Sequence, residues 1–483
     1  MKRFNTSIFG AICITLIISS GLMGQNRFDA LRYSQTLPGN DAATLGMSGS
    51  SMTSYYGFGS IYQNPALAAL ARKSEFSFGL GFRDVSESGV YLSSQSKFDD
   101  QQSGISNIGY LFRFPTDQGS LVLGGGYNQI ANFNRATPVN AFNGNHSIVD
   151  YFLISPGDQY FETAYNTYAI DYDDFFEEYY NTLRYDFNYR GMNQYVEQKE
   201  RGQLGEFNVF LSTEFQPNLF VGGSIGVVMG DYSYQRSFIE EDLAGNYRNA
   251  VYDIKTILNE DKINASVRGV NAKVGMMYRP IDGIRLAVNY TSRTKLDIDE
   301  RYSTFIETEF YTSDNEGFNV YSDTYEGRID YNVTRPSILS AGFGIGLIPF
   351  VDLDVSFDRV NYSRIEMSGL GTIFDRDQNQ SIRSDFEDVV NVKAGVSLNV
   401  SDKFVPRFGV AHYPSPRKSF DSGISFVSAG FSIGLTKNVL LDASVQFADF
   451  DDTLDLYSYG NGVASVSQRV ERVQGMIGVS FRF

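Results

Sequence analysis

The feature that most constrains the fold of this chain is a two-residue alternation of apolar and polar side chains. In residues 351–358, VDLDVSFD, every odd position is apolar and every even position is polar, and residues 441–447 and 392–400 repeat the alternation. Successive side chains of a β-strand point to opposite faces, so this period predicts strands with one apolar face. A soluble β-sandwich with a half-buried sheet would show the same alternation as a membrane-spanning β-barrel, and the pattern alone leaves both architectures open.

The connections between the predicted strands decide between these architectures. Six connections are short, among them PTDQG at 115–119 and TKN at 436–438, and seven are long. Long and short connections alternate along the chain, as a fourteen-stranded up-and-down barrel with both termini on one side requires. The sequence therefore predicts an all-β fold, a 14-stranded antiparallel transmembrane β-barrel. The predicted strands are 75–83, 105–114, 119–130, 204–214, 219–234, 263–278, 283–299, 328–346, 350–366, 387–400, 404–413, 424–434, 438–449 and 470–483, and the long connections are 84–104, 131–203, 235–262, 300–327, 367–386, 414–423 and 450–469.

The composition also favours a barrel that faces lipid. The chain has 39 Phe, 32 Tyr and 46 Gly but no Trp and only 12 Pro, which suits strands and turns better than helices. Aromatic residues near predicted strand ends are typical of the girdles at the two membrane interfaces. These residues are Tyr110, Phe112, Tyr278, Tyr290, Phe404 and Tyr413.

The N-terminus has the pattern of a secretory signal peptide. Lys2 and Arg3 precede an apolar run and a stretch of small residues that ends at Gly24, so we expect residues 1–24 to be removed. The single cysteine, Cys13, lies in this segment, which leaves no thiol for a disulfide or a nucleophile. Loss of two of the 40 basic residues lowers the formal net charge from −16 to −18, and a nucleic-acid partner is therefore not expected.

The last nine residues, GMIGVSFRF, alternate toward a terminal aromatic residue. Ile477, Val479, Phe481 and Phe483 share one face of the predicted last strand. This strand resembles the C-terminal strand that the outer-membrane assembly machinery recognises, so we expect that machinery, together with outer-membrane lipids, as partners. We expect the protein in the outer membrane of a Gram-negative bacterium.

The first part of the mature sequence contains DALRYSQ at 29–35, the segment 41–70 with its Asn64-Pro65-Ala66 corner, and KSEFSFGLGF at 73–82. These segments resemble the FadL/TodX family of outer-membrane transporters for long-chain fatty acids and other hydrophobic compounds. RPSILSAGFGI at 335–345 and RFGVAHYPSP at 407–416 add local likeness. The resemblance implies that residues 25–74 form a hatch inside the lumen of a barrel formed by residues 75–483, that the cargo is a hydrophobic small molecule, and that a bend in the third strand opens the wall sideways.

Two sets of residues are candidates for the transport path. Gly124, Gly125 and Gly126 in the third strand could form the lateral opening, or could leave room for the hatch to pack. Alternation places Lys273, Arg285 and Lys393 on the luminal face, opposite Val274, Leu286 and Val392, where they could bind the carboxylate of a cargo. The alternative is that they pair with luminal acids such as Asp352 or Asp442.

The longest connection is strongly aromatic and has two interpretations. Phe175, Phe176, Tyr179, Tyr180 and Leu183 recur at helix-like spacing, which predicts a short extracellular helix. The segment could capture a hydrophobic ligand or simply cap the barrel.

No enzymatic chemistry is predicted. His146 and His412 are the only histidines, and no hydrolase or zinc motif occurs, so we expect neither a cofactor nor a metal. The segment DRDQNQS at 375–381 starts like a calcium loop but has Gln380 where glycine is required, which predicts a solvated loop.

Two other classes of barrel are alternatives to a transporter of hydrophobic compounds. A hydrophilic porin would lack the luminal segment. A non-transporting platform for surface or secretion proteins is the remaining alternative to a transporter.

Overall fold

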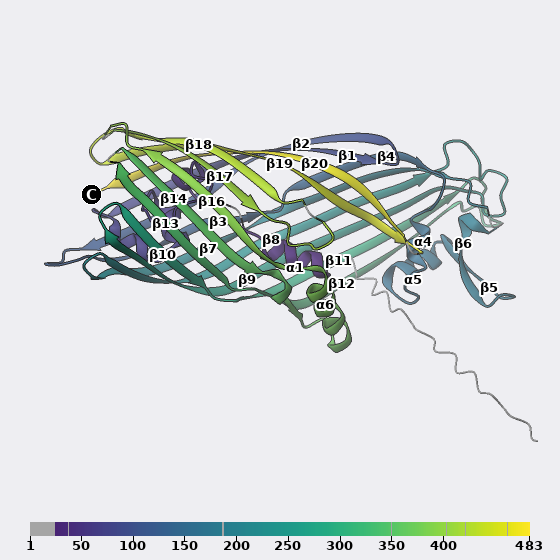
Figure 1. Ribbon diagram of the computed structural model, residues 1–483. Helices are drawn as coiled ribbons and strands as arrows, with labels where there is room; N and C mark the ends of the chain where they lie inside the picture. The colour runs from purple at the N-terminus through teal and green to yellow at the C-terminus, as the bar shows by residue number, and fades with distance from the viewer. Residues whose placement is uncertain are drawn as a thin grey trace, which may run out of the picture.

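The computed structural model describes residues 25–36, 38–185, 188–348, 350–401, 403–420, 422–460 and 462–483. The predicted signal peptide, residues 1–24, lies outside this set. The chain forms one long barrel with the C-terminus at one end and α4 (Val149–Phe152), α5 (Gln159–Asn166), β5 (Ile170–Asp173) and β6 (Glu178–Asn181) at the other (Figure 1). Within the described residues, no helix has both the length and the apolar character needed to cross a membrane.

The wall is a closed antiparallel sheet of fourteen strands, as predicted. Four of these strands are each split in two: β3 continues as β4, β10 as β11, β12 as β13, and β14 as β15. The barrel closes where β1 pairs with β20, from Glu75 opposite Arg482 to Val90 opposite Ser467. The strands are β1 (Glu75–Tyr91), β2 (Ser94–Phe114), β3 (Leu121–Asn132), β4 (Arg135–Asn143), β7 (Met192–Gln216), β8 (Leu219–Glu241), β9 (Ile254–Ile281), β10 (Ile284–Thr291), β11 (Thr294–Phe310), β12 (Val320–Arg335), β13 (Ile338–Ile348), β14 (Val351–Asn361), β15 (Glu366–Ser368), β16 (Asp388–Leu398), β17 (Phe404–Tyr413), β18 (Ile424–Gly434), β19 (Val439–Tyr459) and β20 (Gly462–Arg482).

The outer surface divides the barrel into two parts. On β9 the outward side chains are apolar from Tyr278 to Val270, whereas the next outward residues are Arg268 and Ser266. The same change separates Tyr290 from Lys295 on the neighbouring strand. An apolar band of this kind marks the height that spans a membrane. We call the part beyond this band the extension.

The extension is built by strands that are much longer than a membrane requires. β9 has 28 residues, whereas a spanning strand needs about 9–11. The predicted long connections 84–104, 235–262, 300–327 and 450–469 are therefore mostly strand: β1, for example, runs to Tyr91 and β2 restarts at Ser94. The sequence did not predict this because both faces carry polar residues there, so the two-residue alternation is weak.

The interior of the extension is filled by the connection between β4 and β7. α4 and α5 place Phe152 and Tyr160 in a buried cluster, with their rings stacked at 6.2 Å between centroids. The helix predicted over 175–183 is wrong, since β5 and β6 form a hairpin, followed by the short 3-10 helix η2 (Thr182–Arg184). Cross-strand contact between Tyr172 and Tyr179, 4.8 Å between ring centroids, explains the aromatic spacing.

The N-terminal segment lies inside the barrel and packs against the inner wall. It contains α1 (Arg27–Ser34), α2 (Ala42–Leu45), α3 (Phe58–Gln63) and the 3-10 helix η1 (Pro65–Leu70). Asn64 caps η1 by accepting from Ala66 N at 3.1 Å and donates to Met52 O at 3.1 Å, while Pro65 occupies the first turn. Ser212 Oγ on β7 donates to Ala66 O at 3.0 Å. The Asn64-Pro65-Ala66 corner thus joins the segment to itself and to the wall.

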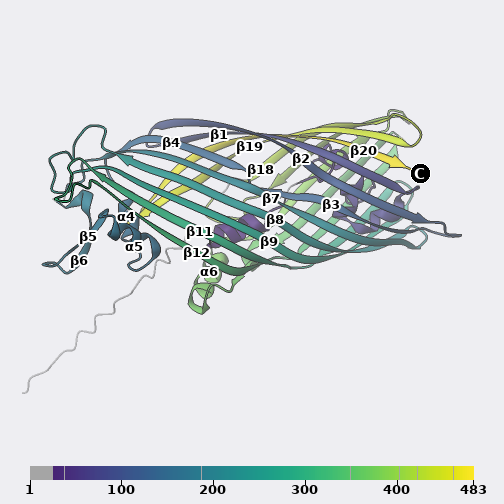
Figure 2. The ribbon, with the colours of Figure 1, turned by 180° about the vertical axis from the view of Figure 1, so that it is seen from behind.

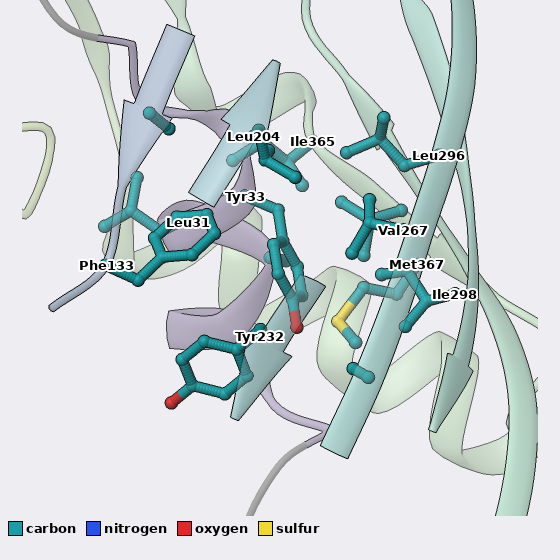
Figure 3. Packing of buried hydrophobic residues seen from close by; sticks show 14 of the residues in the cluster. Leu31, Tyr33, Phe133, Leu204, Tyr232, Val267, Leu296, Ile298, Ile365 and Met367 are labelled. Atoms are coloured by element: carbon teal, nitrogen blue, oxygen red, sulfur yellow. The ribbon is translucent and has the colours of Figure 1, made fainter. Parts of the chain in front are cut away.

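The helix α1 crosses the lumen just above the apolar band and anchors one of the large buried clusters (Figure 3). The Tyr33 ring meets the rings of Phe133 and Tyr232 edge-on, at 5.8 and 5.9 Å between centroids. Figure 2 shows α1 behind β7, β8 and β9, with α6 (Thr372–Asp385) next to it.

The predicted solvated loop at 375–381 is wrong, because these residues belong to α6. Asp375 accepts from Leu370 N at 3.0 Å, and Asn379 accepts from Met367 N at 2.8 Å. These polar side chains bind the backbone that leads from β15 through the turn before α6. A short 3-10 helix, η3 (Tyr362–Arg364), precedes β15.

Candidate functional site: a luminal cavity beside the hatch

A cavity of about 90 Å³ lies between the N-terminal segment and the wall. The segment contributes Ser34, Thr36, Pro38, Gly39, Asn40, Gly49, Met52, Tyr62 and Gln63. The wall contributes side chains from seven barrel strands. The polar and charged ones that matter below are Glu206, Lys273, Arg335, Asp358 and Lys393, and the apolar ones are Ile338, Val360 and Tyr413. Tyr413, predicted in an interfacial girdle, faces this cavity instead.

Two of the three predicted basic residues line the cavity, and each faces a carboxylate. Lys273 Nζ lies 2.8 Å from Glu206 Oε1 and 3.3 Å from the centre of the Tyr62 ring. Lys393 Nζ lies 2.6 Å from Asp358 Oδ2. Both lysines are therefore neutralised by luminal acids.

Arg285, the third predicted residue, does not line the cavity. It pairs with Asp352, one of the two acids named as an alternative partner. Asp442, the other, faces Arg407 on β17, with Nη1 3.4 Å from Oδ1. The structure does not bring the three basic residues together at one place.

Arg335 is the basic residue that sequence reasoning missed. It is 7% exposed, lines the cavity, and its Nη2 donates one long hydrogen bond, 3.5 Å, to Ser34 O. Among the described residues, no carboxylate lies within 4 Å of its guanidinium. A buried cation without an acidic partner is costly, and such a group is a candidate binding site for an anion.

The wall is irregular where Arg335 lies. The inward residues are odd-numbered on β10 but even-numbered on β11, which follows it. In the same way they are odd-numbered on β12 but even-numbered on β13. Pro336 has no N–H to donate, and Ser292 Oγ accepts from Ala272 N at 3.0 Å in the neighbouring break. Because of this change of phase, the alternation did not assign Arg335 to the luminal face. The Arg335-Pro336 pair within a predicted strand was a sequence sign that the strand is interrupted there.

The three glycines of the third strand lie in a regular part of the wall. Gly124, Gly125 and Gly126 are paired with β2 on one side and with β7 on the other. A Cβ at Gly126 would lie 2.7 Å from the Phe58 ring of α3. The wall is therefore closed at the predicted opening, and the absence of a side chain at Gly126 lets the hatch approach it.

The third strand separates from β2 a few residues later and stays paired with β7. Its ladder with β2 ends at Asn128, its register with β7 shifts between Gln129 and Ala131, and β4 then continues along the luminal side. Arg135 on β4 reaches Glu87 on β1 at 3.2 Å and Asp452 on β19 at 2.8 Å. Asn40, which lines the cavity, donates to Gln129 O at 3.0 Å. The cavity and the bend thus meet at Asn40.

The fold and site define a class, outer-membrane β-barrels whose lumen is occupied by an N-terminal segment. The sequence matches the profile of the family described as "Outer membrane protein transport protein (OMPP1/FadL/TodX)" over residues 179–455, more than half of the chain, and the chain belongs to this family. The predicted family resemblance is confirmed, as is the outer-membrane location. No curated protein sequence matches the chain.

Solved structures of low sequence identity share the fold. The toluene transporter TodX of P. putida is 12% identical, with a TM-score of 0.57 over 92% of this chain and 99% of that one. A FadL homologue of Pseudomonas aeruginosa is 12% identical, with a TM-score of 0.55 over 93% and 100%. The CymD monoaromatic hydrocarbon channel is 13% identical, with a TM-score of 0.53 over 92% and 98%.

Proposed function

We propose that this protein carries hydrophobic molecules with an anionic head group, such as long-chain fatty acids, across the outer membrane. The observation that carries the proposal is Arg335, a buried guanidinium in the cavity wall without a carboxylate partner. A carboxylate can accept two parallel hydrogen bonds from a guanidinium, which offsets the cost of burying the charge. Met52, Ile338, Val360 and Tyr413 line the same cavity and offer apolar contacts to a tail.

The cargo then leaves sideways, at the end of the β2–β3 ladder above Asn107 and Asn128. The support for this place is the bend of the third strand, which ends the pairing with β2 at the level where the outer surface changes from apolar to charged. The contact of Asn40 with Gln129 O joins the cavity to the bend. Lateral release suits an apolar cargo, since the bilayer is a better solvent for it than the aqueous periplasm.

Replacement of Arg335 tests the head-group assignment. Arg335→Gln should weaken binding of palmitate to the detergent-solubilised protein by about 10- to 100-fold, the value of one charge-assisted contact. Binding of hexadecanol, which has the same chain and no charge, should not change. Arg285→Gln is the matched control, because Arg285 is luminal but lies outside the cavity. Unchanged palmitate binding, or equal loss for acid and alcohol, would contradict the assignment.

A further inference from the structure

The residue that follows the predicted signal peptide is buried against a carboxylate. Gln25 is 1% exposed, and its Nε2 donates to Glu300 Oε1 at 3.0 Å. The other oxygen of Glu300 accepts from the Tyr331 hydroxyl at 3.1 Å. Glu300 lies on β11, in the extension, where the outward neighbours Asp299 and Arg301 are charged. The start of the mature chain is thus held in the lumen by a fully buried acid.

The surroundings of Gln25 contain more negative than positive charge. Asp29, Glu200 and Glu300 are each less than 9% exposed, and Arg32 is the cation that faces them. Arg32 binds Asp29 and lies 3.1 Å from Glu200, so both of its contacts are taken by the other two acids. Among the described residues, no basic side chain lies within 4 Å of Glu300. Burial raises the pKa of Glu300 to about 8, since a lone buried carboxylate is costly to ionise.

The hydrogen bonds at this place leave one acceptor without a donor. Asn26 N donates to Asp29 Oδ2 at 3.1 Å as part of the capping box that starts α1, which places the backbone next to Gln25 beside Asp29. Gln25 Oε1 is buried, and none of the described residues donates a hydrogen bond to it. A group with several N–H donors and a positive charge would satisfy both the acids and this oxygen.

We propose that Glu300 and Asp29 form the binding site for the protein's own N-terminal ammonium, which removal of the signal peptide creates on Gln25. Hydrolysis of the Gly24–Gln25 peptide bond consumes one water and leaves a carboxylate on Gly24 and an ammonium on Gln25. The new cation offsets the excess of buried negative charge and adds donors where they are missing. Processing and docking of α1 in the lumen are therefore coupled, independently of the cargo.

The first measurement is the intact mass and N-terminal sequence of protein purified from outer membranes. We expect a chain that begins with an unmodified Gln25. A different first residue would overturn the proposal, and so would cyclisation of Gln25 to pyroglutamate, which removes the charge.

The second measurement is the pKa of the N-terminal amine in the folded protein. It is obtained from the pH dependence of acylation by N-hydroxysuccinimidyl acetate, followed on the N-terminal peptide by mass spectrometry, with the exposed Lys437 as internal reference. Nearby carboxylates raise the pKa of an amine, so we expect a value about one unit or more above the ordinary 7.7–8.0. The titratable and charged groups around this place are Glu300, Asp29, Arg32, Glu200, Tyr331, Tyr33 and Tyr232.

Glu300→Gln removes the charge; its amide oxygen can still accept from Gln25 Nε2, and its NH2 group can donate to the Tyr331 hydroxyl oxygen. It should lower the amine pKa toward the ordinary range and raise the acylation rate at pH 7 by about tenfold, which corresponds to one pKa unit. Glu240→Gln is the control, because Glu240 is also a fully buried glutamate but binds Ser147, Ile148 and Gln194. An amine with an ordinary or lowered pKa in the unmodified protein would overturn the proposal even if the variant failed to fold.

Discussion

The two parts of the barrel share one wall but fill their interiors differently. Within the apolar band and just above it, the lumen holds a segment from the start of the chain, which leaves a cavity and the unpaired Arg335. In the extension, the filling comes from the connection between β4 and β7, and the buried cation Arg236 has a carboxylate partner there, with Nη2 2.7 Å from Asp261 Oδ2. The interior around Arg236 is thus packed like a protein core, whereas the cavity retains a buried cation without a carboxylate partner among the described residues.

The largest expected effect comes from breaking the buried ion pair of the extension. The side chains of Arg236 and Asp261 are 0% and 3% exposed, and Asp261 also accepts from Tyr160 at 2.9 Å and Thr304 at 2.8 Å. Asp261→Asn leaves Arg236 without its counter-charge and should cost about 3–5 kcal/mol in the free energy of unfolding. Urea unfolding and limited proteolysis of the extension measure this. Arg335→Gln, which removes an unpaired charge, should cost far less, and equal losses would contradict the comparison.

A somewhat smaller effect is expected from Glu240, and it depends on pH. Burial raises the pKa of Glu240 from its ordinary value of 4.5 to about 7. The folded protein therefore holds this proton where the unfolded chain has lost it, so stability falls as pH rises from about 4.5 to 7, by about 3 kcal/mol in total. Glu240→Gln should remove this fall and raise the melting temperature at pH 8. If the variant and the unmodified protein show parallel stability curves between pH 4.5 and 8, the prediction fails.

The smallest effect concerns the contact between the hatch and the third strand. An added Cβ at Gly126 would meet Ile108 O on β2 and lie 2.7 Å from the Phe58 ring of the hatch. At Gly125, an outward position of the same strand, it would lie 2.7 Å from Asn208 O on β7 and away from the hatch. Gly126→Val should cost about 1–3 kcal/mol through overpacking and lower the yield of heat-modifiable protein. Gly125→Val is the matched control. Similar yields for both variants, combined with loss of uptake of a hydrophobic probe, would instead favour a lateral opening at these glycines.

The alternation predicted the wall because a membrane imposes it on every spanning strand. It also placed Lys273 and Lys393 correctly on the luminal side. The alternation failed to predict the strands of the extension, because both faces of the sheet tolerate polar residues there. It also failed to place Arg335 in the lumen, because the phase of the strand changes at Pro336. The partners of the lysines, Glu206 and Asp358, come from other strands, and no local pattern reports a pairing across the lumen.

The helix α1 is synthesised first, but its contacts come from distant parts of the chain. Gln25 binds a residue 275 positions later in the sequence, and Arg27 N donates to Gln378, 351 positions later. Contacts of such separation form late, because the intervening chain must be ordered first. The segment of residues 25–34 therefore cannot make these contacts until β11 and α6 are in place. Any helper that shields it during this interval has to bind residues 25–34 in a form that the finished barrel no longer displays.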